Sequence, residues 1–126
     1  MDMLSRNSLL MLERSMDFLW TKQRVILDNV SNAETPGYKA KSVTFEETLR
    51  DRIQRAENGS GESMEEVLKS ARPVVRELPG ITRMDDNGVN VTEQSLEMVR
   101  NAYQLQYVMS AMNSELSAMR MAARGQ

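Results

Sequence analysis

Apolar residues recur every three to four positions over two stretches of the chain, one in each terminal part. In the first stretch seven of eight such positions are apolar, and in the second all eight are. The first set is Leu9, Leu12, Met16, Leu19, Gln23, Ile26, Val30 and Ala33, and the second is Met98, Ala102, Leu105, Met109, Met112, Leu116, Met119 and Ala123. This spacing is typical of the packing seam of a coiled coil. It predicts two long helices, over about residues 5–33 and 92–122, that pair antiparallel in a coiled-coil-like manner.

Each predicted helix also carries apolar residues outside its seam. They are Leu10, Met11, Phe18, Trp20 and Leu27 on the first helix, and Leu96, Val99, Tyr103, Tyr107 and Val108 on the second. An antiparallel pair buries one stripe of each helix, whereas soluble monomers seldom expose large contiguous apolar patches. We therefore expect a partner to cover the remaining stripes. In the alternative, a compact four-helix bundle, the middle of the chain covers them.

The middle of the chain is far more polar than its ends. Residues 36–90 hold nine basic and ten acidic residues, more than the two terminal parts together. We expect short helices near 45–57 and 64–71, and two short strands, 73–78 and 81–84, around a turn at Pro79-Gly80. Three capping patterns mark the helix starts, namely Thr44 with Glu47, Ser63 with Glu66, and Asn90 with Glu93.

These patterns predict a mainly α protein with one structural domain in three parts. Residues 1–35 form an N-terminal long helix, and residues 91–126 form a C-terminal one. Residues 36–90 form a surface excursion with short helices and an irregular or β-hairpin segment.

Composition narrows the classes of function. The chain has 126 residues, no Cys and no His, so it lacks the thiolate and imidazole groups of many catalytic and metal sites. Its adjacent acidic pairs are typical of solvated helix faces and caps, and we predict no enzyme, cofactor or metal. The net charge of −2 argues against a nucleic-acid partner. We also expect no small-molecule substrate, no membrane span and no cleavable signal peptide.

A third pattern lies where the first long helix ends. Pro36 and Gly37 suit the two central positions of a type II turn, in which the glycine supplies the positive φ. Asn29 and Asn32 share one face of the last helical turn, where their amides can bind free carbonyls or reach a neighbouring element. Tyr38 follows with an apolar ring and a polar tip. A helix stop followed by an ordinary loop is the simpler interpretation.

Residues 29–40, which read NVSNAETPGYKA, closely resemble the N-terminal signature of the bacterial flagellar rod and hook proteins. As in that family, the signature follows a long amphipathic helix and precedes a segment that contains a phenylalanine, Phe45. Residues 87–91 and Glu93 resemble the start of the family's C-terminal helix. The short chain, without a large intervening β domain, is similar to the short rod proteins of the family.

The resemblance implies a structural subunit of the flagellar basal-body rod, which polymerises through its terminal helices and passes torque from the inner-membrane motor ring to the hook. It implies export through the flagellar type III apparatus, without a cleavable signal peptide, to a place outside the inner membrane. The implied partners are copies of the chain, paralogous rod proteins, proteins at the base of the basal body and the export gate.

Three groups of residues become candidates for these roles. The candidate assembly turn comprises Asn29, Asn32, Thr35, Pro36, Gly37, Tyr38 and Lys39. The candidate seam comprises Leu9, Leu12, Met16, Leu19, Ile26, Val30, Met98, Ala102, Leu105, Met109, Met112, Leu116 and Met119. Leu9, Leu10, Met11 and Leu12 are candidates for recognition by the export gate.

A second class of function fits the exposed apolar stripes. A helical adaptor or export chaperone of the flagellar type III system would bind a partner helix in a groove between its own helices. Such a protein would form a compact particle that does not grow into a filament. It would leave the signature turn without an explanation.

Overall fold

The computed structural model describes residues 3–45, 47–59, 61–79 and 89–125, with the backbone alone at 3–5 and 47–49. Its elements are, in chain order, α1 (Met3–Ser31), β1 (Lys41–Phe45), α2 (Glu47–Glu57), α3 (Met64–Ser70), β2 (Pro73–Glu77) and α4 (Val91–Ala123). The fold is mainly helical, with two long terminal helices as predicted. Both long helices begin and end within two residues of their predicted bounds.

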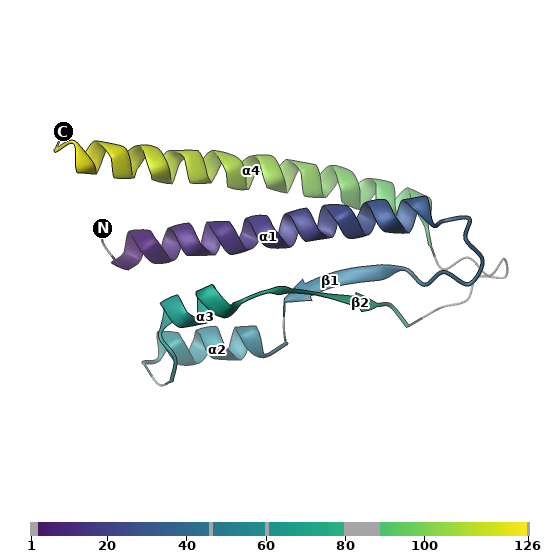
Figure 1. Ribbon diagram of the computed structural model, residues 1–126, viewed down its shortest axis with the longest axis horizontal. Coiled ribbons are helices and arrows are strands. Elements are labelled where there is room, and N and C mark those ends of the chain that lie inside the picture. The colour runs from purple at the N-terminus through teal and green to yellow at the C-terminus, as the bar shows by residue number, and fades with distance from the viewer. Residues whose placement is uncertain (1–2, 46, 60, 80–88, 126) are drawn as a thin grey trace.

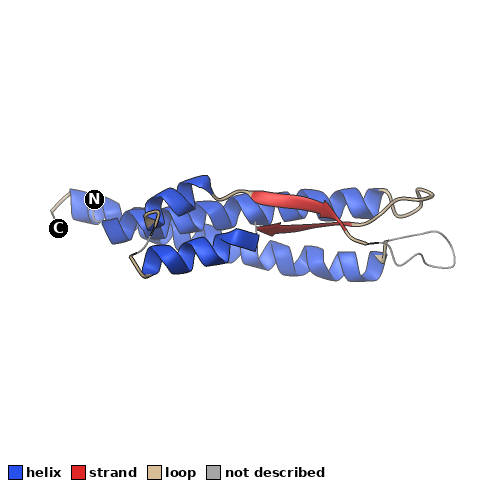
Figure 2. Ribbon diagram, turned by 90° about the horizontal axis from the view of Figure 1, so that it is seen from below, coloured by secondary structure: helices blue, strands red, loops and turns tan. Residues whose placement is uncertain are grey.

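Helix α1 lies in the middle of the molecule (Figure 1). Helix α4 runs along one side of it in the opposite direction, and β1, β2 and α3 pack along another side. Helix α2 packs on α3 (Figure 2). The middle of the chain therefore packs mainly on α1. In the alternative prediction, a four-helix bundle, it would cover the remaining apolar stripes of both long helices.

The small sheet gives the first strand of the predicted hairpin a partner that was not predicted. Strand β2 pairs antiparallel with β1, from Lys41 opposite Glu77 to Phe45 opposite Pro73. The predicted partner of this strand, residues 81–84, lies outside the described residues. The turn signal at Pro79-Gly80 predicts a partner that is adjacent in sequence. The observed partner, β1, is separated from β2 by the helices α2 and α3. Strand β1 itself was not predicted.

The strand also changes the start of the first short helix. The prediction placed that start near residue 45, with Thr44 as the cap. Thr44 instead lies within β1, and α2 begins at Glu47. Alternating β-branched and apolar residues at Val43, Thr44 and Phe45 favour the extended backbone here.

The other two predicted caps are confirmed. At α3 the Ser63 hydroxyl accepts a hydrogen bond from the Glu66 backbone N–H at 3.2 Å, and the Glu66 carboxylate accepts one from the Ser63 N–H at 3.0 Å. At α4 the Asn90 side-chain oxygen accepts a bond from the Glu93 N–H at 3.2 Å. Each cap satisfies backbone donors that a helix start leaves free.

Two groups of buried residues hold the long helices and the turn together. Between α1 and α4, Leu19 packs with Leu105 and Val108. This first group lies near the middle of the pair. The second group, at the end where α1 stops and α4 begins, comprises Ala33, Ala40, Val89 and the partly buried Tyr38. Within the described part of the chain, no helix is long and apolar enough to cross a membrane.

Candidate functional site

The turn after α1 has the geometry that its sequence predicts. The Asn32 side-chain amide donates to the Asp28 carbonyl at 2.8 Å, and the Asn32 backbone N–H donates to the same carbonyl at 3.0 Å. The Tyr38 N–H donates to the Thr35 carbonyl at 3.2 Å and so closes a tight turn around Pro36 and Gly37. Gly37 has a φ of +72°, as the third position of a type II turn requires.

Asn29 is the centre of this region, although it lies on the last full turn of the helix. Its side chain is 1% exposed. Its oxygen accepts hydrogen bonds from the Lys41 N–H at 2.9 Å and from the Tyr38 hydroxyl at 3.1 Å. Its nitrogen donates to the Lys41 carbonyl at 2.9 Å and to the Gln94 side-chain oxygen at 3.1 Å. One buried amide thus ties together α1, the turn, β1 and α4.

Tyr38 completes the same network. Its ring packs against Ala33, Ala40 and Val89, and its hydroxyl reaches Asn29. Burial raises the pKa of Tyr38 above its ordinary value of 10.0, and the nearby Asp28 and Glu77 carboxylates raise it further. The tyrosine is therefore held as a neutral hydrogen-bond donor.

The candidate turn residues divide into an inner and an outer set. Asn29 is buried, and Asn32 and Tyr38 are partly buried. The exposed residues of the set are Thr35, Pro36, Gly37 and Lys39. The inner residues therefore fix the path of the chain, and the outer ones are open to a neighbouring molecule.

The predicted stripe of α1 faces the interior of the molecule. Leu19, Ile26 and Ala33 are buried, and no residue of the stripe is exposed. The half-buried members are Leu9, Leu12, Met16, Gln23 and Val30. Within the candidate export run, Met11 is exposed and the three leucines are half-buried.

The stripe of α4 differs from the predicted one. Leu105 is buried, and Met98, Met112 and Met119 are half-buried, but Ala102, Met109 and Leu116 are exposed. The buried neighbours of Leu105 are Asn101 and Val108. The predicted stripe is an unbroken series of apolar residues, and it therefore takes Ala102 in place of the polar Asn101. The fixed spacing then places the next members at Leu105 and Met109 and omits Val108.

Polar side chains that the sequence analysis missed connect α1 to α4. The Asn101 amide donates to the Leu19 carbonyl and to the Gln23 side-chain oxygen, each at 2.9 Å. Near the other end of the pair, the Ser8 hydroxyl donates to the Glu115 carboxylate at 3.0 Å. The signal that could have found Asn101 is its place one heptad from Gln94 and Val108, on a helix face that also carries Leu105.

One ion pair also crosses this interface. The Lys22 ammonium lies 3.1 Å from the Glu97 carboxylate, and both side chains are about 30% exposed. The hydrogen bond and charge of Lys22, with a smaller effect of Arg100, lower the pKa of Glu97.

The outer side of α4 is unusually apolar for an exposed helix. Tyr103 and Tyr107 are 70% and 76% exposed, and Leu96, Val99 and Met109 are also exposed. Residues 101–114 contain no charged side chain. On α1, Trp20 and Leu27 are exposed as well. We call the exposed residues Leu96, Val99, Tyr103 and Tyr107, which recur at helical spacing, the α4 outer face.

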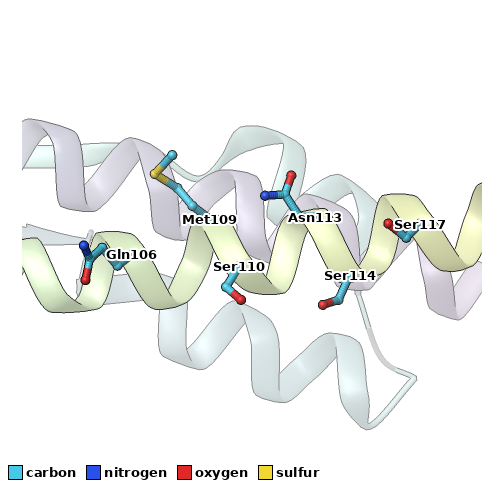
Figure 3. A pocket seen from close by; sticks show the side chains of 6 residues that line it. All are labelled: Gln106, Met109, Ser110, Asn113, Ser114 and Ser117. Carbon is cyan, nitrogen blue, oxygen red and sulfur yellow. The ribbon is translucent and has the colours of Figure 1, made fainter.

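Two surface hollows adjoin this face. One, of about 480 Å³, lies between α1, α4 and the end of β1. Its walls include Phe18 and Phe45, whose rings stack with centroids 4.9 Å apart, and Tyr103 and Tyr107. The other, of about 660 Å³, is open and runs along the second half of α4. Figure 3 shows the residues that line it, namely Gln106, Met109, Ser110, Asn113, Ser114 and Ser117.

These features suit contact with other proteins better than chemistry on a small molecule. Among the described residues, no group of three or more acidic side chains is placed to hold a metal ion. The polar groups gathered by the turn and by Asn101 bond within the chain, whereas the exposed side chains of α4 over residues 101–114 are apolar or uncharged.

Curated proteins similar to this chain agree with that conclusion. The flagellar basal body rod protein FlgB of Aeromonas hydrophila is 26% identical over 114 residues, which is 83% of each chain. FlgB of Escherichia coli K12 is 27% identical over 78% of this chain and 79% of its own length. FlgB of Bacillus subtilis 168 is 26% identical over 90% of this chain and 91% of its own.

The chain is FlgB-like. No protein-family model matches it. The likeness to FlgB extends over most of both chains, so it includes the signature turn and part of each long helix. It supports a structural protein of the flagellar basal-body rod, which assembles with other basal-body proteins.

Proposed function

We propose that this chain is a rod subunit that polymerises through α1 and α4 with copies of itself and with paralogous rod proteins. The assembled rod would transmit torque from the inner-membrane motor ring to the hook. The chain would act as one structural domain, in which residues 1–35 and 91–126 form the rod core and residues 36–90 form its surface. The observation that carries the proposal is the apolar outer side of α4, which has no charged residue over positions 101–114.

That side has the composition of a protein interface core. Interface cores are depleted in charged residues and enriched in tyrosine and methionine. Here Tyr103, Tyr107 and Met109 are exposed within a stretch that has no charge. Since α4 meets α1 through one narrow stripe, the outer face is left for a neighbouring subunit. A contact between different faces of identical subunits extends into a filament instead of closing.

The signature turn would supply a second contact. The buried bonds of Asn29 and Tyr38 hold its path, and the exposed Thr35, Pro36 and Lys39 stand at the surface. A turn held so firmly presents its outer residues to an adjacent subunit at little further cost in conformational entropy.

A strain that lacks the gene for this chain tests the proposal. Complementation with the full-length double variant Tyr103→Asp, Tyr107→Asp should reduce the amount of the protein in purified basal bodies at least tenfold and abolish swimming. Both side chains are exposed, so the helicity of the purified variant should stay at the wild-type value. The double variant Gln54→Asp, Asn58→Asp, at exposed positions in and just after α2, adds the same two charges to a surface outside the α1–α4 pair and should leave assembly intact. Normal assembly of the Tyr103→Asp, Tyr107→Asp variant would refute the role of the α4 outer face.

The route to the rod would be the flagellar type III apparatus, without a cleavable signal peptide. Leu9, Leu10, Met11 and Leu12 would be recognised by the export gate before the chain folds. Alanine substitutions in this run should lower the amount of the protein secreted into the medium. If they block assembly and leave secretion unchanged, the run serves packing alone.

One observation favours a helical adaptor or export chaperone as the second candidate. The hollow of about 480 Å³ beside Phe18, Phe45 and Tyr103 is apolar enough to receive part of a partner helix. An adaptor would remain a small complex with its client and would be missing from purified basal bodies. The same complementation experiment therefore separates the two functions.

A further inference from the structure

Asn101 is fully buried between the two long helices, at 0% exposure. Both N–H groups of its amide are used at 2.9 Å, one by the Leu19 carbonyl and one by the Gln23 side-chain oxygen. The Leu19 carbonyl can only accept a hydrogen bond, so the amide nitrogen must face α1. Among the described residues, none donates a hydrogen bond to the remaining Oδ1 atom. A buried polar side chain with an atom that makes no hydrogen bond lowers stability compared with an apolar side chain of the same size. Asn101 is therefore expected to have a role other than stabilising the fold.

The apolar contacts of the pair leave the relative position of the helices weakly defined. Leucine, methionine and isoleucine repeat along the α1 stripe, and leucine and methionine repeat along α4. Such contacts are non-directional, and side chains of similar volume replace one another at small cost. Sliding α4 by one heptad, about 10 Å at 1.5 Å per residue, would again place apolar residues opposite apolar residues.

Asn101 distinguishes the observed alignment from these shifted ones, because the side chain that accepts its second hydrogen bond, Gln23, has no equivalent elsewhere in the α1 stripe. Gln23 is the single polar residue among the eight stripe positions of α1. One heptad before it stands Met16, and one heptad after it stands Val30. A slide of one heptad that brings Asn101 to Met16 therefore leaves one of its N–H groups without a side-chain acceptor in a buried place. A slide in the other direction puts Asn101 in the place of Gln94 beside Asn29, whose side-chain oxygen already accepts two hydrogen bonds. Polar contacts nearer the ends of the pair, Ser8 with Glu115 and Asn29 with Gln94, are consistent with the same alignment.

We propose that Asn101, through Gln23, sets the register of α4 against α1. A single buried asparagine at a seam position is known to select one alignment of a helix pair at the expense of stability. The proposal does not depend on the function proposed above. It concerns the folded chain itself. By fixing the position of α4 along α1, Asn101 would also fix where each residue of the α4 outer face lies.

Distances between spin labels test the register directly. The chain has no cysteine, so Glu13→Cys on α1 and Ser95→Cys on α4 would provide the only two labels, both at exposed positions far apart along the pair. A slide of one heptad would change their separation by roughly 10 Å. In the parent protein, pulsed electron paramagnetic resonance should show one narrow distance population.

The substitution Asn101→Leu in that labelled chain should give a second distance population, of at least a tenth of the molecules, whose label separation differs by about 10 Å. Asn113→Leu makes the same chemical change at an exposed place on α4 and should keep the single population. Gln23→Leu, which removes the acceptor and leaves Asn101 in place, should also broaden the distribution. If Asn101→Leu does not fold, Gln23→Leu alone decides. A single, unshifted distance in Gln23→Leu, or in a folded Asn101→Leu, would overturn the proposal.

Discussion

The side-chain amide of Asn29 pairs with both backbone groups of Lys41, twelve residues further along the chain, and each hydrogen bond is 2.9 Å long. The helix residue thus presents to β1 the donor and acceptor that a neighbouring strand would present. On its other side β1 pairs with β2. The first residue of the strand is therefore held to α1 and to β2 at once.

Asn29→Ala should lower the free energy of unfolding by about 2–3 kcal/mol. The substitution leaves the buried Lys41 backbone groups and the Tyr38 hydroxyl without their partner, and each unsatisfied group costs about 1–3 kcal/mol before relaxation. Urea unfolding followed by circular dichroism measures the loss. Asn32→Ala, at a less buried position of the same turn, should cost about 1 kcal/mol or less. Equal losses for the two variants would contradict the central place of Asn29.

Gly37→Val should disturb the turn without meeting any neighbouring atom. An added Cβ at Gly37 would have nothing within 4 Å, so its cost arises from the φ of +72° alone. That backbone conformation costs an L-residue about 1–2 kcal/mol, and more for a β-branched one. The midpoint of thermal unfolding of Gly37→Val should therefore fall, and Gly37→Asn should lose less. The incorporation of Gly37→Val into basal bodies should fall more than the helicity of the purified protein. Full motility of Gly37→Val would show that the turn tolerates another path.

Tyr38 should make stability depend on alkaline pH. Its pKa is raised in the folded state, so folding favours the protonated phenol. This contribution is fully present below the unfolded value of about 10 and is lost as the pH rises through the folded value. The difference in unfolding free energy between the wild type and Tyr38→Phe should therefore shrink from pH 8 to about pH 11. Tyr107→Phe, at an exposed position, should leave the wild-type pH dependence unchanged.

The ion pair between Lys22 and Glu97 should contribute at neutral pH and vanish in acid. The pKa of Glu97 is lowered by Lys22, so its contribution is present above the unfolded pKa and is lost as the pH falls through the folded one. Glu97→Gln should cost about 0.5 kcal/mol at pH 7, since the pair is partly exposed to solvent. The cost should be absent below about pH 3 and smaller in high salt. A cost that persisted in acid would indicate lost packing. Glu57→Gln, on the exposed side of α2, is the matched control.

The long helices and the turn could be predicted from the sequence because their signals are local. Seam residues such as Leu19 and Leu105 recur at helical spacing, and Pro36-Gly37 encodes its own turn geometry. The predicted α4 stripe was displaced because the face that packs on α1 includes polar residues, Asn101 above all, whose partners lie on the other helix. The contact of the Asn29 amide with Lys41 and the pairing of β1 with β2 could not be predicted. Each joins residues that are far apart in sequence, and the spacing of apolar residues along the chain does not identify such partners.

Strands β1 and β2 pair at the base of the segment that carries α2 and α3, and these two helices pack on each other. The connection between α2 and α3 contains Gly59 and Gly61, both exposed and both at positive φ. Extra residues inserted after Gly59 would lengthen a loop whose two ends are already held together by the strands below it. That loop is thus a suitable place for an epitope tag or a fluorescent label, through which the protein could be followed in living cells without altering its helices.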